Sequence, residues 1–417
     1  MRVLYTALLY LLTPFMLLRL IWRGFSLRDY WQRWPERFGF VPRAPAGVAV
    51  WVHAVSVGEA LSALPLVNEL IARYGHGHVW MTTMTPTGSA RVHAALGGRV
   101  IHSYVPYDLP GAVGRFLDSA RPRQVVFMET ELWPNLLHAV KARGIPLTIA
   151  NARLSPRSFK GYSRIRGFIG EVLACATRIA AQSELDAERF RALGAQRVDV
   201  MGNLKFELAV PDEQRARGVE LRRQLGAARP VWVAASTHEG EEAVLLETHR
   251  RILQQLPQAL LILVPRHPQR FDSVARLIEK SGLSFTRRSA PGSSAHAVLL
   301  GDSMGEMFSY LAAADLAFVG GSLVPVGGHN VLEPAALGLP VLFGPFMHNF
   351  LGAAQLLTEA GAGQESDVED LSGDVLRLLN DPATCSRMGE AGRKAVEANR
   401  GALARLLKLL DVSASGG

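Results

Sequence analysis

Short apolar runs alternate with amphipathic segments over most of the chain. From Pro45 onward, each run is followed by a stretch with the three-to-four-residue spacing of a helix; the runs are VAVWVHAV, HVWMTTMT, RVIHSYVP, QVVFMET and IPLTIANA. RIAAQS and VDVMGN continue this rhythm as far as about Glu207. Strands that are separated by helices pair in parallel through right-handed crossovers. The pattern therefore predicts an α/β fold with a doubly wound sheet.

A charged stretch, PDEQRARGVELRRQ, then interrupts the alternation. A second series of apolar runs follows it, namely PVWVAAST, ALLILVPR, AVLLGD, LAFVGGS and PVLFGP. We therefore expect two Rossmann-like domains, an N-terminal one over residues 23–207 and a C-terminal one over residues 208–417. Open α/β sheets bind ligands beyond the carboxyl ends of their strands, so we expect the active site in a cleft between the two halves.

The first residues depart from this pattern. An uncharged apolar run extends from Val3 to Leu18 and predicts a helix, which we assign to residues 1–22 as a membrane anchor, since no small-residue cleavage site follows it. The run is shorter than the roughly 20 residues that span a bilayer, so a tilted span, an interfacial helix and a buried core helix all stay open. The Arg and Trp residues up to Arg37 suit an anionic headgroup layer and, by the positive-inside rule, the cytoplasmic side.

Charge and cysteine content narrow the function classes. The formal net charge is +8, and residues 1–50 hold seven Arg against Asp29 and Glu36, so the basicity is local and we expect no nucleic-acid partner. Cys175 and Cys385 have neither CxxC nor Cys/His spacing, which indicates neither a disulfide framework nor a zinc site. The sequence also lacks a Walker motif, a G-x-S-x-G elbow and an H-E-x-x-H pair, the usual signatures of ATPases, serine hydrolases and zinc peptidases.

Candidate catalytic side chains in the first half follow predicted strands. In WVHAVSVGEA, Ser56, Gly58 and Glu59 lie at a strand-to-helix turn, where Gly58 permits a tight turn or close approach by a ligand. We expect Glu59 to stay ionised beside the free amides of the helix and to act as a general base, although simple helix capping explains Ser56 and Glu59 equally well. METELWPNLL offers Glu129 for sugar hydroxyls, with a capped helix as the alternative.

Cationic side chains follow in two loop-like segments. Arg153 lies in NARLSPRSFKGY, and Lys205 lies in GNLKFE beside the domain boundary. Both suit phosphate or carboxylate groups, with a solvated basic loop as the alternative for the first.

Glycine-rich strand ends mark the second half. ASTHEGEE, which contains Ser236, has the form of an anion-binding helix N-terminus. The strongest signal is FVGGSLVPVGGHNVLEPAALGLPVLFGP, in which Glu333 is placed to accept hydrogen bonds from ribose hydroxyls. Its two glycine pairs would let backbone amides approach a phosphate; they are Gly320, Gly321, Gly327 and Gly328.

This ordered set of motifs resembles the Kdo transferase family of lipid A biosynthesis, a group of inverting glycosyltransferases with the GT-B fold. The match rests on five segments and covers nearly the whole chain; they are WVHAVSVGEA, METELWPNLL, NARLSPRSFKGY, LVPRHPQRF and GGSLVPVGGHNVLEPAA. The resemblance implies that Glu59 is the catalytic base. It also implies a CMP-sugar site formed by Pro265, Arg266, Met304, Gly305, Glu306, Asn330, Val331, Leu332 and Glu333.

The resemblance further implies transfer of Kdo from CMP-Kdo to the lipid A precursor, lipid IVA, in the cytoplasmic leaflet of the bacterial inner membrane. We expect Arg266 and the amides around Gly327, Gly328 and Asn330 to stabilise the departing CMP phosphate. We expect no cofactor and no bound metal. A GT-B enzyme that uses a UDP-sugar and a non-catalytic membrane scaffold are the alternatives.

Overall fold

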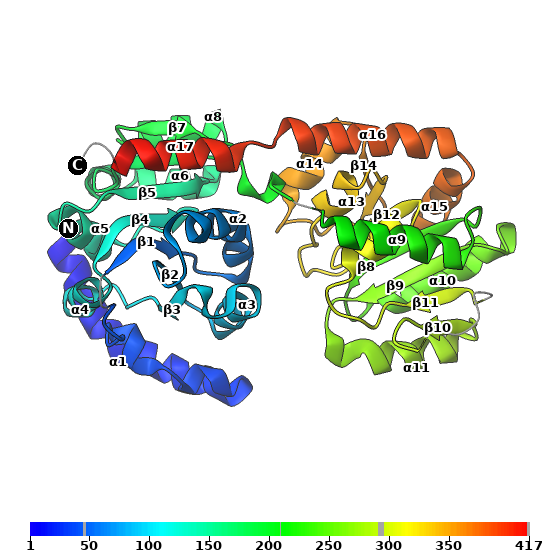
Figure 1. Cartoon of the computed structure of the whole chain (residues 1–417), viewed down its shortest axis with the longest axis horizontal. Helices are drawn as coiled ribbons and strands as arrows, with labels where there is room; N and C mark the ends of the chain where they lie inside the picture. The colour runs from blue at the N-terminus through cyan, green and yellow to red at the C-terminus, as the bar shows by residue number, and fades with distance from the viewer. Residues whose placement is uncertain (45–46, 209, 291–295, 415–417) are drawn as a thin grey trace. The chain divides into compact units, whose positions relative to one another are not determined.

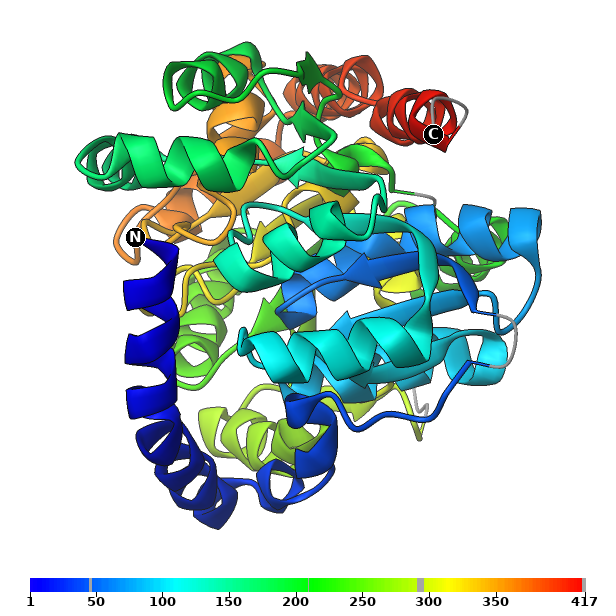
Figure 2. The same ribbon diagram turned by 90° about the vertical axis from the view of Figure 1, so that its left-hand side faces the viewer.

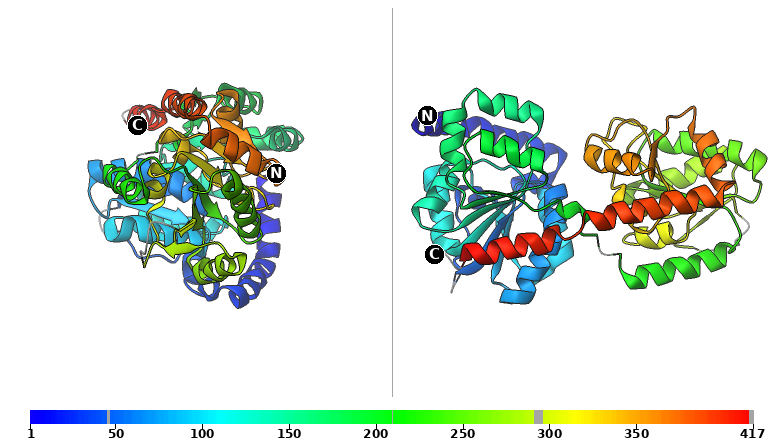
Figure 3. Two further views of the ribbon diagram at one scale, coloured as in Figure 1. Left: turned by 90° about the vertical axis from the view of Figure 1, so that its right-hand side faces the viewer. Right: turned by 90° about the horizontal axis from the view of Figure 1, so that it is seen from above.

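The chain folds into two compact units. The computed structural model describes residues 1–44, 47–208, 210–290 and 296–414. Unit 1 consists of Met1–Glu207 with Arg400–Gly417, and unit 2 consists of Leu208–Asn399. Each unit contains a seven-stranded parallel sheet with helices on both faces (Figures 1 and 3). The predicted fold class, α/β with two doubly wound Rossmann-like domains, is confirmed.

Unit 1 has the strand order β3-β2-β1-β4-β5-β6-β7. Its strands are β1 (Val48–His53), β2 (Val79–Thr83), β3 (Ile101–Tyr104), β4 (Pro122–Met128), β5 (Leu147–Ala152), β6 (Arg178–Ala181) and β7 (Val198–Val200). Its helices are α1 (Arg2–Ser26), α2 (Val57–Tyr74), α3 (Pro86–Leu96), α4 (Pro110–Ala120), α5 (Pro134–Ala142), α6 (Pro156–Ser163), α7 (Arg166–Leu173), α8 (Glu184–Ala192) and α17 (Ala402–Ala414).

Both faces of this sheet are covered, which explains why its strands read as almost continuous apolar runs. Successive side chains of a strand point to opposite faces. Trp51 of β1 accordingly packs in one cluster with Phe116 and Phe127, whereas Val50 and Val52 pack in another.

The last helix, α17, belongs to unit 1 and corrects the predicted domain of residues 208–417. Leu406 and Leu410 are buried in the same cluster as Leu66 of α2. The periodicity of this segment predicts a helix, but it carries no information on which domain the apolar face covers.

Unit 2 has the strand order β10-β11-β9-β8-β12-β13-β14. Its strands are β8 (Val231–Thr237), β9 (Leu260–Pro265), β10 (Phe285–Arg287), β11 (Val298–Leu300), β12 (Leu316–Val319), β13 (Val341–Phe343) and β14 (Gly363–Glu365). Its helices are α9 (Asp212–Leu225), α10 (Glu241–Gln255), α11 (Phe271–Ser281), α12 (Met307–Ala312), α13 (Leu332–Ala336), α14 (Leu351–Glu359), α15 (Leu371–Leu379) and α16 (Pro382–Ala398). The two edge strands, β10 and β14, have no apolar run and were not predicted.

The strand order reverses beside the first strand of each unit. β1 lies between β2 and β4, and β8 lies between β9 and β12. At such a switch point the connections diverge to opposite sides, and open α/β sheets bind ligands there, beyond the carboxyl ends of the strands.

Helix α1 is long and apolar enough, by length and composition, to cross a membrane. Most of its side chains are exposed, so the alternative of a buried core helix is wrong. The helix is compatible with membrane association.

Candidate functional site

Glu59 lies in the first turn of α2, directly after β1, at the switch point of unit 1. Its carboxylate accepts hydrogen bonds from the Val55 N–H at 2.8 Å and from the Ser56 hydroxyl at 2.9 Å. The Glu59 N–H is donated to Ser56 Oγ at 3.3 Å, so Ser56 is the N-cap of α2. The capping arrangement is therefore present, and it holds the carboxylate in one orientation.

Burial raises the pKa of Glu59 to about 7. The carboxylates of Glu129 and Glu131 add to this increase, whereas the hydrogen bonds from Val55 and Ser56 oppose it. The sequence predicts that Glu59 stays ionised, but with this pKa the carboxyl is only partly ionised at neutral pH, because loss of water outweighs the hydrogen bonds from Val55 and Ser56. A carboxylate with a pKa near the operating pH is well matched to accept a proton from an alcohol.

Gly58 does not serve as a tight turn. It lies within α2, is not among the residues with positive φ, and a Cβ at this position would meet only Ser56 Oγ, at 3.9 Å. The missing side chain instead leaves open space beside Glu59.

Glu129 follows β4, the neighbour of β1. Its φ of 57° is left-handed, a conformation that costs a non-glycine residue about 1 kcal/mol, and its N–H is donated to the Ala150 carbonyl at 2.8 Å. Glu131 accepts a hydrogen bond from Trp133 Nε1 at 2.7 Å, and burial raises its pKa. Three carboxyl groups, from Glu59, Glu129 and Glu131, thus gather at the switch point of unit 1.

The two predicted cations lie near the end of β5. The N–H of Arg153 is donated to Thr130 Oγ1 at 3.2 Å, which joins this exposed arginine to the loop after β4. Lys205 lies after β7 in the short helix η4 (Leu204–Phe206). The Leu204 N–H is donated to Asn151 Oδ1 at 3.0 Å, so the segment returns to the end of β5.

The residues predicted for the CMP-sugar site share the carboxyl edge of the unit 2 sheet. Pro265 ends β9 and Arg266 follows it, while Met304, Gly305 and Glu306 follow β11. The segment Asn330–Glu333 follows β12, and Ser236, with φ 59°, forms a register shift near the end of β8. These strands are neighbours in the sheet, so the fold brings the motifs to one edge.

Arg266 and Glu333 interact electrostatically at this edge. Burial raises the pKa of Glu333, whereas the hydrogen bond from Asn330 Nδ2, at 3.2 Å, and the Arg266 guanidinium oppose that increase. Glu333 is therefore a half-buried acceptor beside a cation.

Three other residues of the predicted set have different surroundings. The side chains of Val331 and Leu332 are fully buried in the core, so a ligand would meet only their backbone. Glu306 pairs with Arg288 at 3.1 Å and accepts a hydrogen bond from Ser303, which lowers its pKa.

The glycine amides of unit 2 are mostly engaged within the protein. The Gly320 N–H is donated to the Ala235 carbonyl at 2.8 Å, and the Gly328 N–H to the Gly321 carbonyl at 2.7 Å. The Gly321 N–H is donated to the carboxylate of Glu241 at 2.7 Å. The expectation that these three amides bind a phosphate is therefore wrong.

Glu241 acts as an internal anion. Its fully buried carboxylate also accepts the N–H groups of His238, Ser322 and Leu323, at 2.8, 2.9 and 2.9 Å. The nest predicted to hold an external anion beside Ser236 is thus filled by a glutamate of α10. Sequence gives no signal of this, because three of the four donors lie about eighty residues further along the chain.

Three histidines cluster beside Arg266 and were not included in the predicted site. His238 and His329 stack, with their Nε2 atoms 2.8 Å apart, and His267 meets His238 edge-on at a centroid distance of 5.2 Å. Burial, followed by the charge of Arg266, lowers the pKa of His329 to about 3. One ring must therefore donate and the other accept in a neutral pair.

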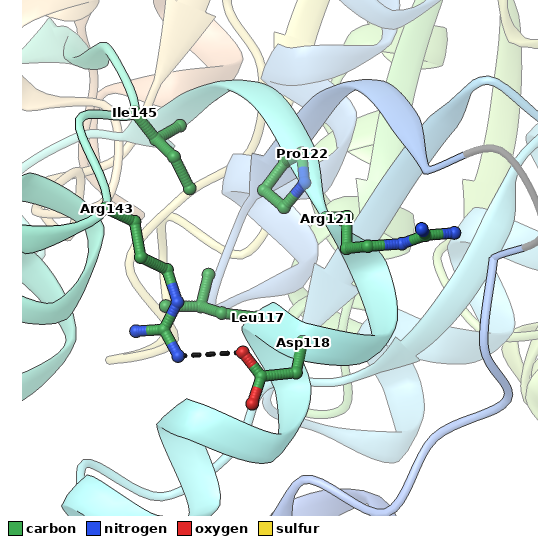
Figure 4. Close-up of a pocket in the computed structure, with 6 residues that line it drawn as sticks. All are labelled: Leu117, Asp118, Arg121, Pro122, Arg143 and Ile145. Atoms are coloured by element: carbon green, nitrogen blue, oxygen red, sulfur yellow. Dashed lines mark hydrogen bonds and ion pairs between the residues drawn. The ribbon is translucent and has the colours of Figure 1, made fainter.

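A pocket in unit 1 lies away from these residues. Asp118, Arg121, Pro122 and Arg143 line it with Leu117 and Ile145, and Arg143 pairs with Asp118 at 2.8 Å (Figure 4). Pro122 begins β4, so this pocket lies at the amino ends of the strands, opposite Glu59.

Within the described ranges, no group of three or more His, Cys, Asp or Glu residues is arranged to hold a metal ion. Both cysteines are free. Catalysis without a bound metal stays a prediction.

Similarity to known proteins identifies the family. A family model described as 3-deoxy-D-manno-octulosonic-acid transferase (kdotransferase) matches residues 32–208. The 3-deoxy-D-manno-octulosonic acid transferase of Haemophilus influenzae is 42% identical over 418 residues, which cover 98% of each chain. That of Bordetella pertussis is 42% identical over 396 residues, covering 90% of this chain and 91% of the relative.

A crystal structure of UDP-GlcNAc 2-epimerase from Neisseria meningitidis, bound to UDP-GlcNAc, supports the fold alone. It has a TM-score of 0.57 and 14% identity, and covers 87% of this chain and 100% of that one. The identity and coverage of the two bacterial relatives decide the family: this chain belongs to the 3-deoxy-D-manno-octulosonic acid (Kdo) transferases and is a glycosyltransferase.

Proposed function

We propose that this protein transfers Kdo from CMP-Kdo to lipid IVA, the lipid A precursor, with inversion at the anomeric carbon and with Glu59 as the general base. The buried, hydrogen-bonded carboxylate of Glu59 is the observation that carries the proposal. The sugar follows from the family. The donor and the acceptor are consistent with the five motifs, each of which contributes residues at the carboxyl edge of one of the two sheets.

In the proposed reaction, Glu59 takes the proton of an acceptor hydroxyl as the oxygen attacks the anomeric carbon of Kdo. The bond between that carbon and the CMP phosphate oxygen breaks, and CMP leaves with the electron pair. The Arg266 guanidinium is the proposed partner of the negative charge on the departing phosphate. Asn330 and Glu333 are the proposed contacts of the nucleotide.

Three further predicted contacts are proposed to bind the substrates. Glu129 is proposed to bind sugar hydroxyls, and Arg153 and Lys205 the carboxylate of Kdo or the phosphates of the acceptor. The exposed apolar helix α1 and its neighbouring arginines support a location at the cytoplasmic leaflet of the bacterial inner membrane.

The test is transfer by the purified full-length protein from CMP-Kdo, generated in situ, to a tetraacyl lipid A precursor, with products resolved by mass. A mass increase of one or more Kdo units that is absent with Glu59→Gln supports the proposal. If CMP protects the wild type against thermal unfolding but no Kdo is transferred, the proposal that lipid IVA is the acceptor is refuted. Protection by UDP and not by CMP refutes the donor.

A further inference from the structure

Helix α1 presents a continuous apolar stripe to the outside. Large side chains that are between 51% and 75% exposed recur at steps of three and four residues, so they share one face of the helix. We call them the outer stripe; they are Leu4, Leu8, Leu11, Phe15, Leu18, Trp22 and Phe25. Soluble proteins rarely leave an apolar surface of this length uncovered.

The opposite face of α1 is attached to unit 1 near its beginning. The Tyr5 hydroxyl donates a hydrogen bond to Asp108 Oδ2 at 2.9 Å, and Thr6 Oγ1 donates one to Asn135 Oδ1 at 3.0 Å. Asp108 and Asn135 are only 5% and 7% exposed, and Asp108 also accepts the N–H groups of Asn135 and Leu136. The start of α1 therefore contacts the folded body of the unit.

The end of α1 is attached as well. Leu20 is buried with Tyr107, Leu109 and Ala112. Thr6 and Leu20 are separated by fourteen residues, or about 21 Å of helix. A proline at position 14 removes one helical hydrogen bond, and Figure 2 shows that the helix bends along its length. The two contacts hold α1 lengthwise against unit 1.

These contacts are incompatible with a transmembrane orientation. A span would place α1 in a hydrocarbon layer about 30 Å thick. Its Tyr5 and Thr6 contacts would then draw Asp108, Asn135 and the surrounding polar body into the same layer, where polar groups and loops are not tolerated. Helix α1 could therefore cross the membrane only if it first detached from unit 1.

The charges around the outer stripe favour a lipid surface as its partner. Arg19, Arg23 and Arg28 are exposed at its C-terminal end, near the exposed aromatic rings of Trp22 and Trp31. Arginine with tryptophan is the combination that suits an anionic headgroup layer, whereas these like charges would repel each other across two copies of the chain.

We infer that α1 lies flat on an anionic bilayer with the outer stripe immersed at the boundary between headgroups and acyl chains, and that it does not cross the membrane. The inference deepens the membrane association proposed above. Met1 and unit 1 are then on the same side of the membrane. The experiments below measure membrane topology and lipid binding and not Kdo transfer. Failure of the inference about α1 is therefore distinguishable from failure of the proposed reaction.

Side-specific labelling tests the topology. Arg2→Cys and the exposed Glu188→Cys of unit 1 are each introduced into the full chain and treated with a membrane-impermeant maleimide, in spheroplasts and in inverted inner-membrane vesicles. The unmodified chain gives the background from Cys175 and Cys385. Both variants are expected to react in inverted vesicles without detergent. Reaction of Arg2→Cys in spheroplasts, with protection in inverted vesicles, overturns the inference.

Vesicle flotation tests whether the outer stripe binds an anionic lipid surface. The full chain is expected to bind phosphatidylcholine vesicles more tightly when they contain phosphatidylglycerol, and Leu11→Glu or Phe15→Glu is expected to weaken binding by about tenfold or more. The control is Leu185→Glu, at a leucine of α8 that is 62% exposed. If Leu185→Glu weakens vesicle binding as much as the variants of α1 do, the outer stripe is not the lipid-binding surface and the inference is overturned. A dimer in solution that Phe15→Glu converts to a monomer, without loss of vesicle binding, shows that a second copy is the partner and also overturns it.

Discussion

The carboxylate of Glu241 accepts the N–H of Gly321 at 2.7 Å, and through this contact the start of α10 holds the loop that follows β12. Four backbone N–H groups converge on this one buried carboxylate. The loop leads to the segment proposed to bind CMP, so the position of that segment depends on an acidic side chain that is fully buried.

Glu241→Ala is therefore expected to destabilise unit 2 by several kcal/mol, because four donors, two of them buried and two partly buried, lose their acceptor at about 1–3 kcal/mol for each buried unsatisfied group. Urea unfolding of the full chain measures this loss. The matched control is Glu239→Ala, whose side chain is exposed and for which we expect a change within about 0.5 kcal/mol. A Glu241→Ala variant as stable as the control contradicts the structural role.

Replacing Glu59 by Gln is expected to lower kcat by about 10²–10⁴-fold, because the amide cannot accept the acceptor's proton. Gln retains an oxygen for the Val55 N–H, and Ser56 still caps α2, so the affinity for CMP is expected to stay unchanged. Transfer measured by mass spectrometry, beside CMP binding by calorimetry, separates the two effects. A variant with full turnover would exclude Glu59 as the base.

Activity is expected to rise with pH up to a plateau above about 7, because the base must be unprotonated and burial holds the pKa of Glu59 near this value. Glu129→Gln removes a neighbouring negative charge, so the acidic limb of the kcat/KM profile should move to lower pH. An unmoved limb would mean that another group controls the titration.

The same pKa predicts a pH-dependent difference in stability between wild type and Glu59→Gln. The folded pKa of about 7 lies above the ordinary value of 4.5, so protons bind the folded state more tightly. Wild type should lose stability relative to the variant as the pH rises from about 4.5 through about 7. Unfolding of both proteins at pH values on either side of this window measures the difference, and parallel curves would contradict it.

Gly58→Ala tests whether the glycine beside Glu59 is needed for the stability of α2 or for the close approach of a substrate. A Cβ has open space here and alanine favours a helix, so the free energy of unfolding should stay the same or rise by up to about 1 kcal/mol. If a substrate approaches this surface closely, kcat/KM for transfer should nevertheless fall. Unchanged transfer by the stable variant would mean that no ligand uses the space.

Much of the candidate site could be predicted from sequence because its residues follow strands. Apolar runs locate the strands, and parallel strands bring their carboxyl ends to one edge, so Glu59, Glu129 and Arg266 lie near switch points as their motifs indicate. Edge strands β10 and β14 escaped prediction because hydrogen bonds to a neighbouring strand, and not an apolar run of their own, define them.

Local sequence determined the two α/β halves, the helix at the N-terminus and the cap formed by Ser56, since periodicity and capping depend on residues close together in the chain. Only tertiary structure decided that α17 covers unit 1, that Glu241 accepts the Gly321 N–H, that burial moves the pKa of Glu59 to about 7, and that Tyr5 binds Asp108. Each of these depends on which distant groups exclude water from a side chain or offer it a hydrogen bond, and a one-dimensional pattern does not contain that information.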